Sequence, residues 1–547
     1  MNSLTYNIYE FDKSTDISKE IKTLADDINL YNSNEFEKFK KILSSIVCNY
    51  KVIAEHPYVD KNFRDSFYIF HSKKFFEHNR DCTRLLIFED FDEDKFSSDF
   101  SDEYDLDLNN KFIGYMVIQP IYSGLIGTTV INPNYLAGCK GYMCLAKHKC
   151  TVFGHQLSAL GFLYSSQNSE TVTCAELTIL GIVNTLANIS TNYRSILPSD
   201  IMRDRILTDY ERPLPSKGLP YETISRLLCK YTDSSRLYFL DIEDKQNKTE
   251  EELEKDEEKR NNFRRIFHTY VESGIPLAVA VKGQTEQNPN IRHSVICIGH
   301  GNIDCCWSKK ENQKIYAGFC IIESFKGYNK YALIDDNQVP YIIRDFDNLS
   351  IYDSSEVVGF AVSLPRSAFL EADEAYFIAL DALFNFEDTK MEENMLKKVV
   401  NYDKDNNPLV LRVFLVSSAE YKKYKSKTIK SKVLKEHYLK LNLPHYIYVV
   451  EISTALQYNE NCAFGDIIID ATAANTKYSL DSIINIHYCD RMGSVEFVDN
   501  NSLNADQNGE RNRWGSFNVY DGIDEVFKTY NTDNSIRRVD YEKKVVI

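Results

Sequence analysis

The 547-residue sequence lacks the features that mark several large classes of protein. No apolar run approaches the roughly 18 residues of a membrane-spanning helix, which argues against a helical membrane protein. The first 20 residues are polar and acidic, unlike a secretory signal or a transit peptide. No glycine-rich phosphate loop, metal motif or internal repeat is present. We therefore expect a soluble chain that uses no cofactor and no metal ion.

Positive charge is scarce relative to negative charge. The chain has 64 Lys and Arg against 80 Asp and Glu, a formal net charge of −16. Such a balance argues against non-specific nucleic-acid binding and against docking on an anionic membrane. The 13 cysteines are odd in number and follow no framework spacing. Without a signal peptide, reduced thiols in the cytoplasm fit this pattern best.

The length is too great for a single hydrophobic core, so we expect about three units of α+β class. The pattern of apolar runs divides the chain at residues 1–150, 151–368 and 369–547. Within the first unit, Phe67–Phe70 has the composition of a strand, and the acidic segment Phe91–Asp107 is typical of a solvated loop.

Two clusters of residues have the composition of possible binding sites. Zinc-ligand residue types gather at Cys139, Cys144, His148 and Cys150, but their spacing matches no usual finger or ribbon, and the segment instead predicts a strand with a buried cysteine. The basic stretch Lys422–Lys435 is either a docking surface for an acidic partner or, more simply, a solvated helix face. Neither cluster carries a functional prediction.

The sequence indicates a catalytic role for Cys174 more strongly than a function for either cluster. Thr173 and Glu176 form a capping box, which predicts that a helix begins at Cys174 and continues to about Ile189 along an apolar stripe. A thiol in the first turn lies near unpaired backbone N–H groups at the positive end of the helix dipole, which favours the thiolate. Gln167, one loop upstream, could present its amide beside the Cys174 N–H as an oxyanion hole.

Three apolar runs downstream predict strands that could complete the site. They are Ile275–Val281, Arg292–Gly299, which opens with His293, and Tyr331–Asn337, which ends in Asp335 and Asp336. A nucleophile, a base and a carboxylate that orients the base are the parts of a catalytic triad. Since side chains alternate along a strand, only one of the two aspartates is expected to face His293. His300, at the end of the same strand, is a rival base, whereas His155 and His268 are interpreted as structural.

The order Gln–Cys–His–Asp, in these local contexts, resembles that of the papain-like cysteine peptidases, and most closely the bacterial branch that includes the double-glycine leader peptidases. The resemblance spans roughly residues 154–364. It implies a papain-like central domain flanked by two accessory domains. It also implies that Gln167 serves the oxyanion hole, Cys174 is the nucleophile, His293 is the general base, and Asp335 or Asp336 orients the imidazole. The connection from His300 to Lys330 is longer than the family's usual hairpin and could hold an extra pair of strands.

The sequence therefore predicts a cysteine peptidase that cleaves a peptide or isopeptide bond in a specific protein substrate. The accessory domains would select that substrate and could bind a further protein partner. Two alternatives remain open. One is a transglutaminase-like amide transferase, in which an amine replaces water, and the other is a papain-like scaffold that only binds a partner.

Overall fold

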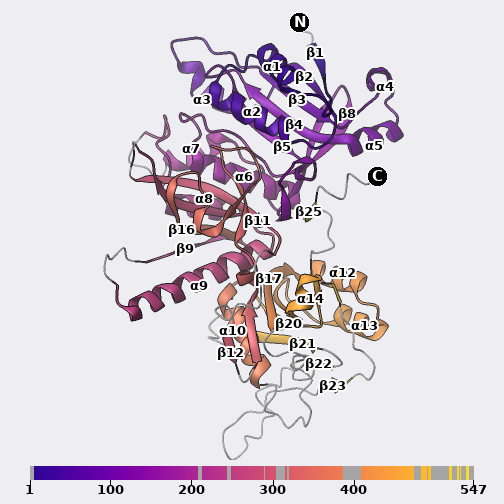
Figure 1. Ribbon diagram of the computed structural model, residues 1–547, viewed down its shortest axis with the longest axis vertical. Helices are drawn as coiled ribbons and strands as arrows, with labels where there is room; N and C mark the ends of the chain where they lie inside the picture. The colour runs from indigo at the N-terminus through magenta and orange to yellow at the C-terminus, as the bar shows by residue number, and fades with distance from the viewer. Residues whose placement is uncertain are drawn as a thin grey trace, which may run out of the picture.

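The computed structural model is elongated, and the three largest β-sheets among its described residues follow one another along its long axis (Figure 1). Helices and mainly antiparallel sheets are mixed throughout, which confirms the predicted α+β class. None of the described helices combines the length and the apolar character needed to span a bilayer. The structure describes all residues except 1–4, 207–211, 243–247, 287, 289, 304–313, 317–318, 386–407, 474–481, 489–490, 495–516, 520–526, 529, 531–537 and 541–547.

The N-terminal sheet has five antiparallel strands in the order β1-β2-β3-β4-β5. Alternate residues of a strand point to opposite faces, so Leu85 and Ile87 of β3 lie in one core, and Leu86 and Phe88 lie in another. Helices α1 and α2 pack on the first face, whereas α3, α4, α5 and the hairpin β7–β8 pack on the second. The bounds are β1 Thr5–Phe11, α1 Ser18–Asp27, α2 Ser33–Ser45, β2 Tyr50–Tyr58, α3 Lys61–Ile69, β3 Cys82–Phe88, α4 Glu93–Ser98, α5 Asp102–Lys111, β4 Phe112–Gln119, β5 Leu125–Ile131, β7 Ala146–Val152 and β8 His155–Gly161.

Two predictions for this region are wrong. Phe67–Phe70 is not a strand but ends helix α3, because Asp60 caps that helix by accepting the N–H of Phe63 at 2.7 Å. The acidic segment Phe91–Asp107 is not a solvated loop. It forms α4 and the start of α5, and these helices bury apolar side chains such as Phe96 against the sheet.

The central sheet is antiparallel, in the order β15-β14-β11-β10-β16-β9, and β6 also pairs with β11. Ala278 of β10 and Ile296 of β11 face a core that includes α6 and α8, whereas Leu277 and Cys297 face a core that includes α9 and α10. Helix α6 begins at Cys174, as the capping box predicts, and β10, β11 and β14 lie close to the three predicted strands. The bounds are β6 Lys140–Met143, α6 Cys174–Ile189, α7 Pro198–Ile206, α8 Tyr221–Tyr231, β9 Ser234–Phe239, α9 Glu250–Glu272, β10 Leu277–Gln284, β11 Ile291–His300, β14 Lys330–Ile334, β15 Ile342–Asp345 and β16 Asp353–Leu364.

The C-terminal sheet follows the order β12-β13-β17-β18-β20-β21-β22-β23. Its first two strands come from the long connection between β11 and β14, where an extra strand pair was predicted, and β13 pairs in parallel with β17. Helix α10 packs on one face, and α12 and α13 pack on the other. The bounds are β12 Lys314–Tyr316, β13 Phe319–Glu323, α10 Ala372–Asn385, β17 Leu409–Ser417, α12 Ser418–Thr428, α13 Lys432–Lys440, β18 Tyr446–Thr454, α14 Ala455–Asn459, β19 Cys462–Ala463, β20 Gly465–Asp470, β21 Ile483–Tyr488, β22 Arg491–Ser494, β23 Phe517–Val519, β24 Phe527–Lys528 and β25 Arg538–Asp540.

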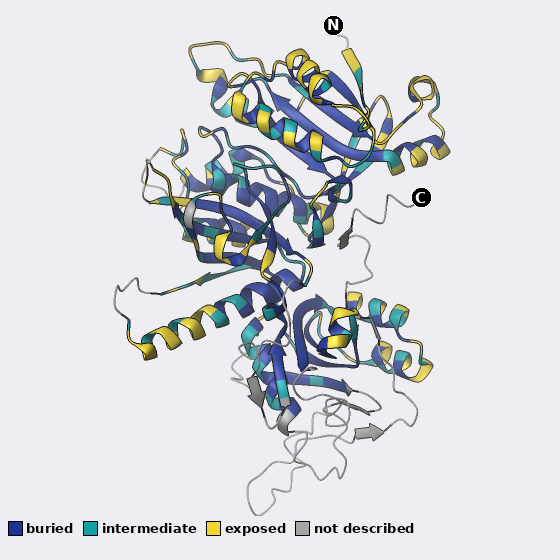
Figure 2. Ribbon diagram, in the orientation of Figure 1, coloured by how far each residue is buried: buried dark blue, intermediate teal, exposed yellow. Residues whose placement is uncertain are grey.

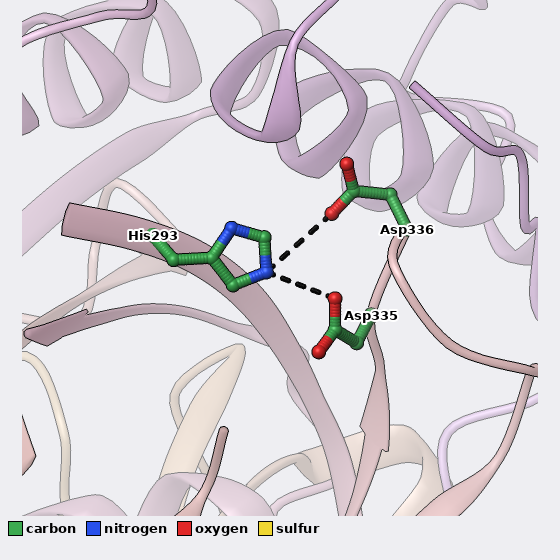
Figure 3. A group of neighbouring side chains, drawn as sticks. All are labelled: His293, Asp335 and Asp336. Carbon is green, nitrogen blue, oxygen red and sulfur yellow. Dashed lines mark hydrogen bonds and ion pairs between the residues drawn. The ribbon is translucent and has the colours of Figure 1, made fainter. Parts of the chain in front are cut away.

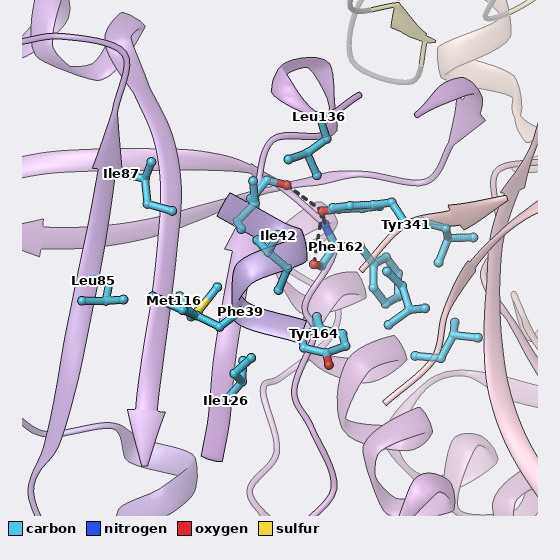
Figure 4. Close-up of a cluster of buried hydrophobic side chains, with 14 of the residues drawn as sticks. Phe39, Ile42, Leu85, Ile87, Met116, Ile126, Leu136, Phe162, Tyr164 and Tyr341 are labelled. Atoms are coloured by element: carbon cyan, nitrogen blue, oxygen red, sulfur yellow. Dashed lines mark hydrogen bonds between the residues drawn. The ribbon is translucent and has the colours of Figure 1, made fainter. Parts of the chain in front are cut away.

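Apolar cores run across the boundaries between the three sheets. One core extends from the N-terminal sheet through Phe39 of α2 and Tyr164 to the central sheet (Figure 4). Inside it, the Tyr341 hydroxyl donates to the Ile131 carbonyl and accepts the Phe162 N–H, both at 2.8 Å. A second core joins α9 and the central sheet to α10 and β17. Exposed residues concentrate on the outer helices and on the first half of α9 (Figure 2).

Candidate active site

Cys174 is the first residue of α6, and the loop before it is tightly braced. Glu176 accepts the backbone N–H of Thr173 at 3.1 Å, which fixes the entry of the chain into the helix. One carbonyl oxygen, Asn168 Oδ1, accepts three successive backbone N–H groups, those of residues 170, 171 and 172, at 2.8–3.1 Å. Cys174 itself is partly exposed. Cys174 is therefore a half-buried residue at a helix start whose geometry is fixed by its neighbours.

Strand register brings the imidazole and the carboxylates together. His293 is the third residue of β11, and β11 pairs with β14 so that Ile296 lies opposite Ile334. The chain leaves β14 directly after Ile334, so Asp335 and Asp336 follow the strand end at the level of His293. All three side chains are buried, with 6% or less of each residue exposed.

Both carboxylates approach the same ring nitrogen (Figure 3). His293 Nε2 lies 2.9 Å from Asp335 Oδ1 and 3.5 Å from Asp336 Oδ1. The expectation that only one aspartate can face His293 is wrong, because the two residues lie in a turn and strand alternation does not apply to them. Asp335 is the closer partner, and its Oδ1 also accepts the backbone N–H of Asn337 at 3.0 Å.

The surroundings of His293 favour its charged form. Burial alone would lower the pKa of His293, but hydrogen bonds with Asp335 and with Cys174, together with the two carboxylates, outweigh burial and raise that pKa to about 11. Burial and the neighbouring charge of Asp335 raise the pKa of Asp336, against the opposing effect of His293. Since Nε2 is directed to the carboxylates, Nδ1 is the ring nitrogen left for the thiol. The arrangement can exchange a proton between a thiol and an imidazole.

Gln167 lies on the carboxylate side of the site. Its Nε2 donates to Asn337 Oδ1 at 2.8 Å, and Asn337 Nδ2 donates to the Tyr352 hydroxyl at 3.3 Å. The Tyr352 ring meets the His293 ring edge-on, with centroids 5.6 Å apart. An amide nitrogen carries two hydrogens, so Gln167 keeps a second N–H for another acceptor. Asn337 and Tyr352 were not predicted from the sequence, although Asn337 is the residue after the two aspartates.

Lys38, from helix α2 of the N-terminal sheet, also reaches this site. Its Nζ donates to the Asp336 backbone carbonyl at 2.9 Å and to Ser166 Oγ at 3.0 Å, and it pairs with Glu35 at 2.8 Å. The Lys38 ammonium therefore connects Ser166, the residue before Gln167, to the turn that contains Asp335 and Asp336. No sequence pattern reveals these contacts, because Lys38 lies 128 positions from Ser166 and 298 positions from Asp336 along the chain.

The other candidate residues lie in different surroundings. His300, the rival base, is buried with its Nε2 3.4 Å from Glu272, in a cluster with His268 and Arg412. His155 and His268, interpreted from the sequence as structural, each lie beside a carboxylate. His155 Nδ1 lies 2.6 Å from Asp105, and His268 Nε2 lies 3.4 Å from Glu272.

The cysteine-rich segment does not form a metal cluster within the described residues. Among them, one group of three possible ligands lies close enough to share an ion, namely His293, Asp335 and Asp336, whose ligand atoms are all within 4.8 Å of one another. Asp335 Oδ1 of this group also accepts the Asn337 N–H. A cavity of about 20 Å³ beside Cys174 has room for little more than one water, so a larger molecule has to reach the sulfur from the solvent side.

Comparison with known proteins assigns no family to this chain. No protein-family model matches the chain, and no curated protein sequence shows a significant match to it.

Proposed function

We propose that this chain is a cysteine peptidase with a papain-like central domain, which cleaves a peptide or isopeptide bond in a protein substrate. The observation that carries the proposal is the position of His293, which is hydrogen-bonded to Asp335 at 2.9 Å and lies close enough to Cys174 for that residue to raise its pKa. A base held between a thiol and a carboxylate is the arrangement by which a weak nucleophile is activated. The start of α6 at Cys174 and the exposure of that residue support the same role.

In the proposed reaction, the Cys174 proton is held by His293 and the thiolate attacks the substrate carbonyl carbon. The oxyanion that forms accepts hydrogen bonds from the Cys174 backbone N–H and from the second N–H of Gln167, each worth about 3 kcal/mol. His293 then protonates the leaving amine as the C–N bond breaks. Water, deprotonated by His293, attacks the thioester and releases the acid, which restores the thiol. Asp335, with Asp336 behind it, orients the imidazole throughout.

The proposed location is the cytoplasm, where thiols stay reduced. The ten cysteines that lie within the described residues are free thiols. Because packed accessory units adjoin the central sheet on both sides, we expect a narrow choice of substrate rather than general digestion. The net charge of −16 does not favour a nucleic-acid partner.

The proposal is tested with a peptide library made by digesting a whole proteome. The full chain is expected to generate new peptide termini within defined sequences, and Cys174→Ala is expected to generate none. Cys229→Ala, which removes an exposed cysteine of α8, is the matched control and is expected to behave like the unaltered chain. A labelled primary amine included in the reaction shows whether an amine replaces water. No Cys174-dependent product of either kind would contradict the proposal and favour a binding scaffold.

A further inference from the structure

A large cavity lies away from Cys174, between the N-terminal sheet and the later turns of α6. Its volume is about 700 Å³, within the range of roughly 300–1,000 Å³ that small-molecule sites occupy. Its walls come from β2, β3, β4, β5 and β7, from the segment that leads into α3, and from α6 and the loop that follows α6. This cavity is separate from the small one beside Cys174 and shares only Leu163 with it.

Buried polar groups line the cavity without full pairing. His148 is only 4% exposed, and its Nε2 has no hydrogen-bond partner among the described residues. Burial lowers the pKa of His148 to about 4, so the ring is neutral at pH 7. Its Nδ1 lies 3.5 Å from the amide nitrogen of Asn188, which can only donate, so Nδ1 is the acceptor and Nε2 carries the proton as a donor. Asn62 Oδ1 is likewise buried and unpaired there, while its Nδ2 donates to Thr128 at 3.3 Å. Unpaired buried groups of this kind are costly unless a ligand or water meets them.

The charge around the cavity is positive, although the chain as a whole is acidic. Arg84 is 3% exposed and is held by Glu55 at 2.8 Å and by the Thr151 carbonyl at 2.7 Å, with its guanidinium 4.3 Å from the centre of the Tyr58 ring. Lys61 and Lys149 are exposed and also line the cavity. Against these three cations stand two carboxyl groups, those of Glu55 and Asp60.

We propose that this cavity binds a small organic anion with an apolar or aromatic body. The excess positive charge at Lys61 and Lys149 attracts the acidic group, and the walls formed by Tyr58, Tyr115 and Leu163 receive the body. His148 Nε2 and Asn62 Oδ1 supply the polar contacts that fix its orientation. The site does not depend on the proposed peptidase activity, since no residue of the Cys174 site lines it.

The test uses 8-anilinonaphthalene-1-sulfonate, an aromatic body with a single sulfonate, whose fluorescence rises on binding. Titration of the full chain is expected to show one saturable site. Lys149→Glu is expected to weaken binding by about tenfold, because it replaces an attracting charge with a repelling one. Lys147→Glu makes the same charge change two residues away on the same strand, where the side chain does not line the cavity, and is expected to leave binding unchanged.

A second arm tests the need for the acidic group. N-Phenyl-1-naphthylamine has the same aromatic body without the sulfonate and is expected to bind at least several-fold more weakly. Equal binding of the two probes would overturn the anion assignment. Equal effects of the two lysine substitutions, or binding that does not saturate, would overturn the site itself.

Discussion

At the scale of single residues, the proposed activity depends on two aspartates that share one imidazole nitrogen. Asp335 is nearer to His293 Nε2 than Asp336 is, at 2.9 Å against 3.5 Å. Asp335→Asn is therefore expected to lower the pKa of His293 by about two, and Asp336→Asn is expected to lower it less. Titration of ¹³C-labelled histidine by NMR measures the pKa of His293 in both variants. Asp345→Asn, an exposed residue of β15, is the control, and an equal effect of all three substitutions would contradict this assignment.

The same residues make the stability of the chain depend on pH. Folding raises the pKa of His293 to about 11 and also raises that of Asp336, so the folded chain binds more protons than the unfolded chain. The stabilisation from His293 is complete below its unfolded pKa of about 6.5 and is lost as the pH rises toward 11. We expect urea unfolding at pH 6, 8 and 10 to show that the free energy of unfolding of the unaltered chain exceeds that of His293→Gln by a smaller amount at each higher pH. A difference that grows with pH would contradict the raised pKa.

At the scale of helices and strands, prediction succeeds where a local signal is strong. The capping box places the start of α6 at Cys174, and apolar runs locate β10, β11 and β14. Prediction from the sequence fails where the burial of a segment depends on residues that are distant in the sequence. The acidic residues of Phe91–Asp107 suggested a loop, yet packing against the sheet makes that segment helical. In the basic stretch of α12, Lys425 is fully buried against Asp466 at 2.5 Å, so this is not simply a solvated face.

Helix α2 supplies a positioning residue that the sequence does not reveal. Lys38→Met removes the bonds to the Asp336 carbonyl and to Ser166, so the aspartate turn and the Gln167 loop are held less firmly. We expect the rate of Cys174 alkylation by iodoacetamide at pH 6 to fall by about threefold to tenfold. Because the buried Glu35 also loses its cation, we expect a loss of stability of about 1–3 kcal/mol. Lys41→Met, on an exposed position of the same helix, should change neither quantity. A large loss of stability with no change in rate would instead assign Lys38 a purely structural role.

At the scale of the whole molecule, length and apolar patterning predict three units, but they do not predict the packing between them. The boundaries drawn at residues 150 and 368 fall within continuous packing, since one core spans the N-terminal and central sheets and another spans the central and C-terminal sheets. Contacts between residues more than a hundred positions apart leave no trace in a local pattern. The candidate site shows the same limit, because the proposed nucleophile and base can be recognised in the sequence whereas Lys38 and Tyr352 cannot.

A buried ion pair joins α9 to the C-terminal sheet. Arg412 Nη2 lies 2.6 Å from Glu272 and Nη1 lies 2.9 Å from Glu451, with all three residues 5% exposed or less. Arg412→Met leaves two buried carboxylates without their cation, and it is expected to destabilise the chain by about 3–5 kcal/mol. Urea unfolding measures the loss, and Lys427→Met, on the exposed side of α12, should cost less than about 0.5 kcal/mol. Similar small losses for both would show that this junction is not held by the ion pair.

The central claim is that His293 activates the Cys174 thiol, and the rate of Cys174 alkylation as a function of pH tests this claim most directly. Iodoacetamide labelling of Cys174 and of the exposed Cys229 is followed by peptide mass spectrometry from pH 5 to pH 8, with a chelator present to exclude metal effects. An ordinary thiol, with a pKa of about 8.5, loses reactivity by about tenfold for each pH unit below that value. Cys174 should react faster than Cys229 throughout this range, and His293→Gln should lower the Cys174 rate to that of Cys229. If Cys174 reacts no faster than Cys229 in the unaltered chain, His293 does not activate it and the proposed mechanism is wrong.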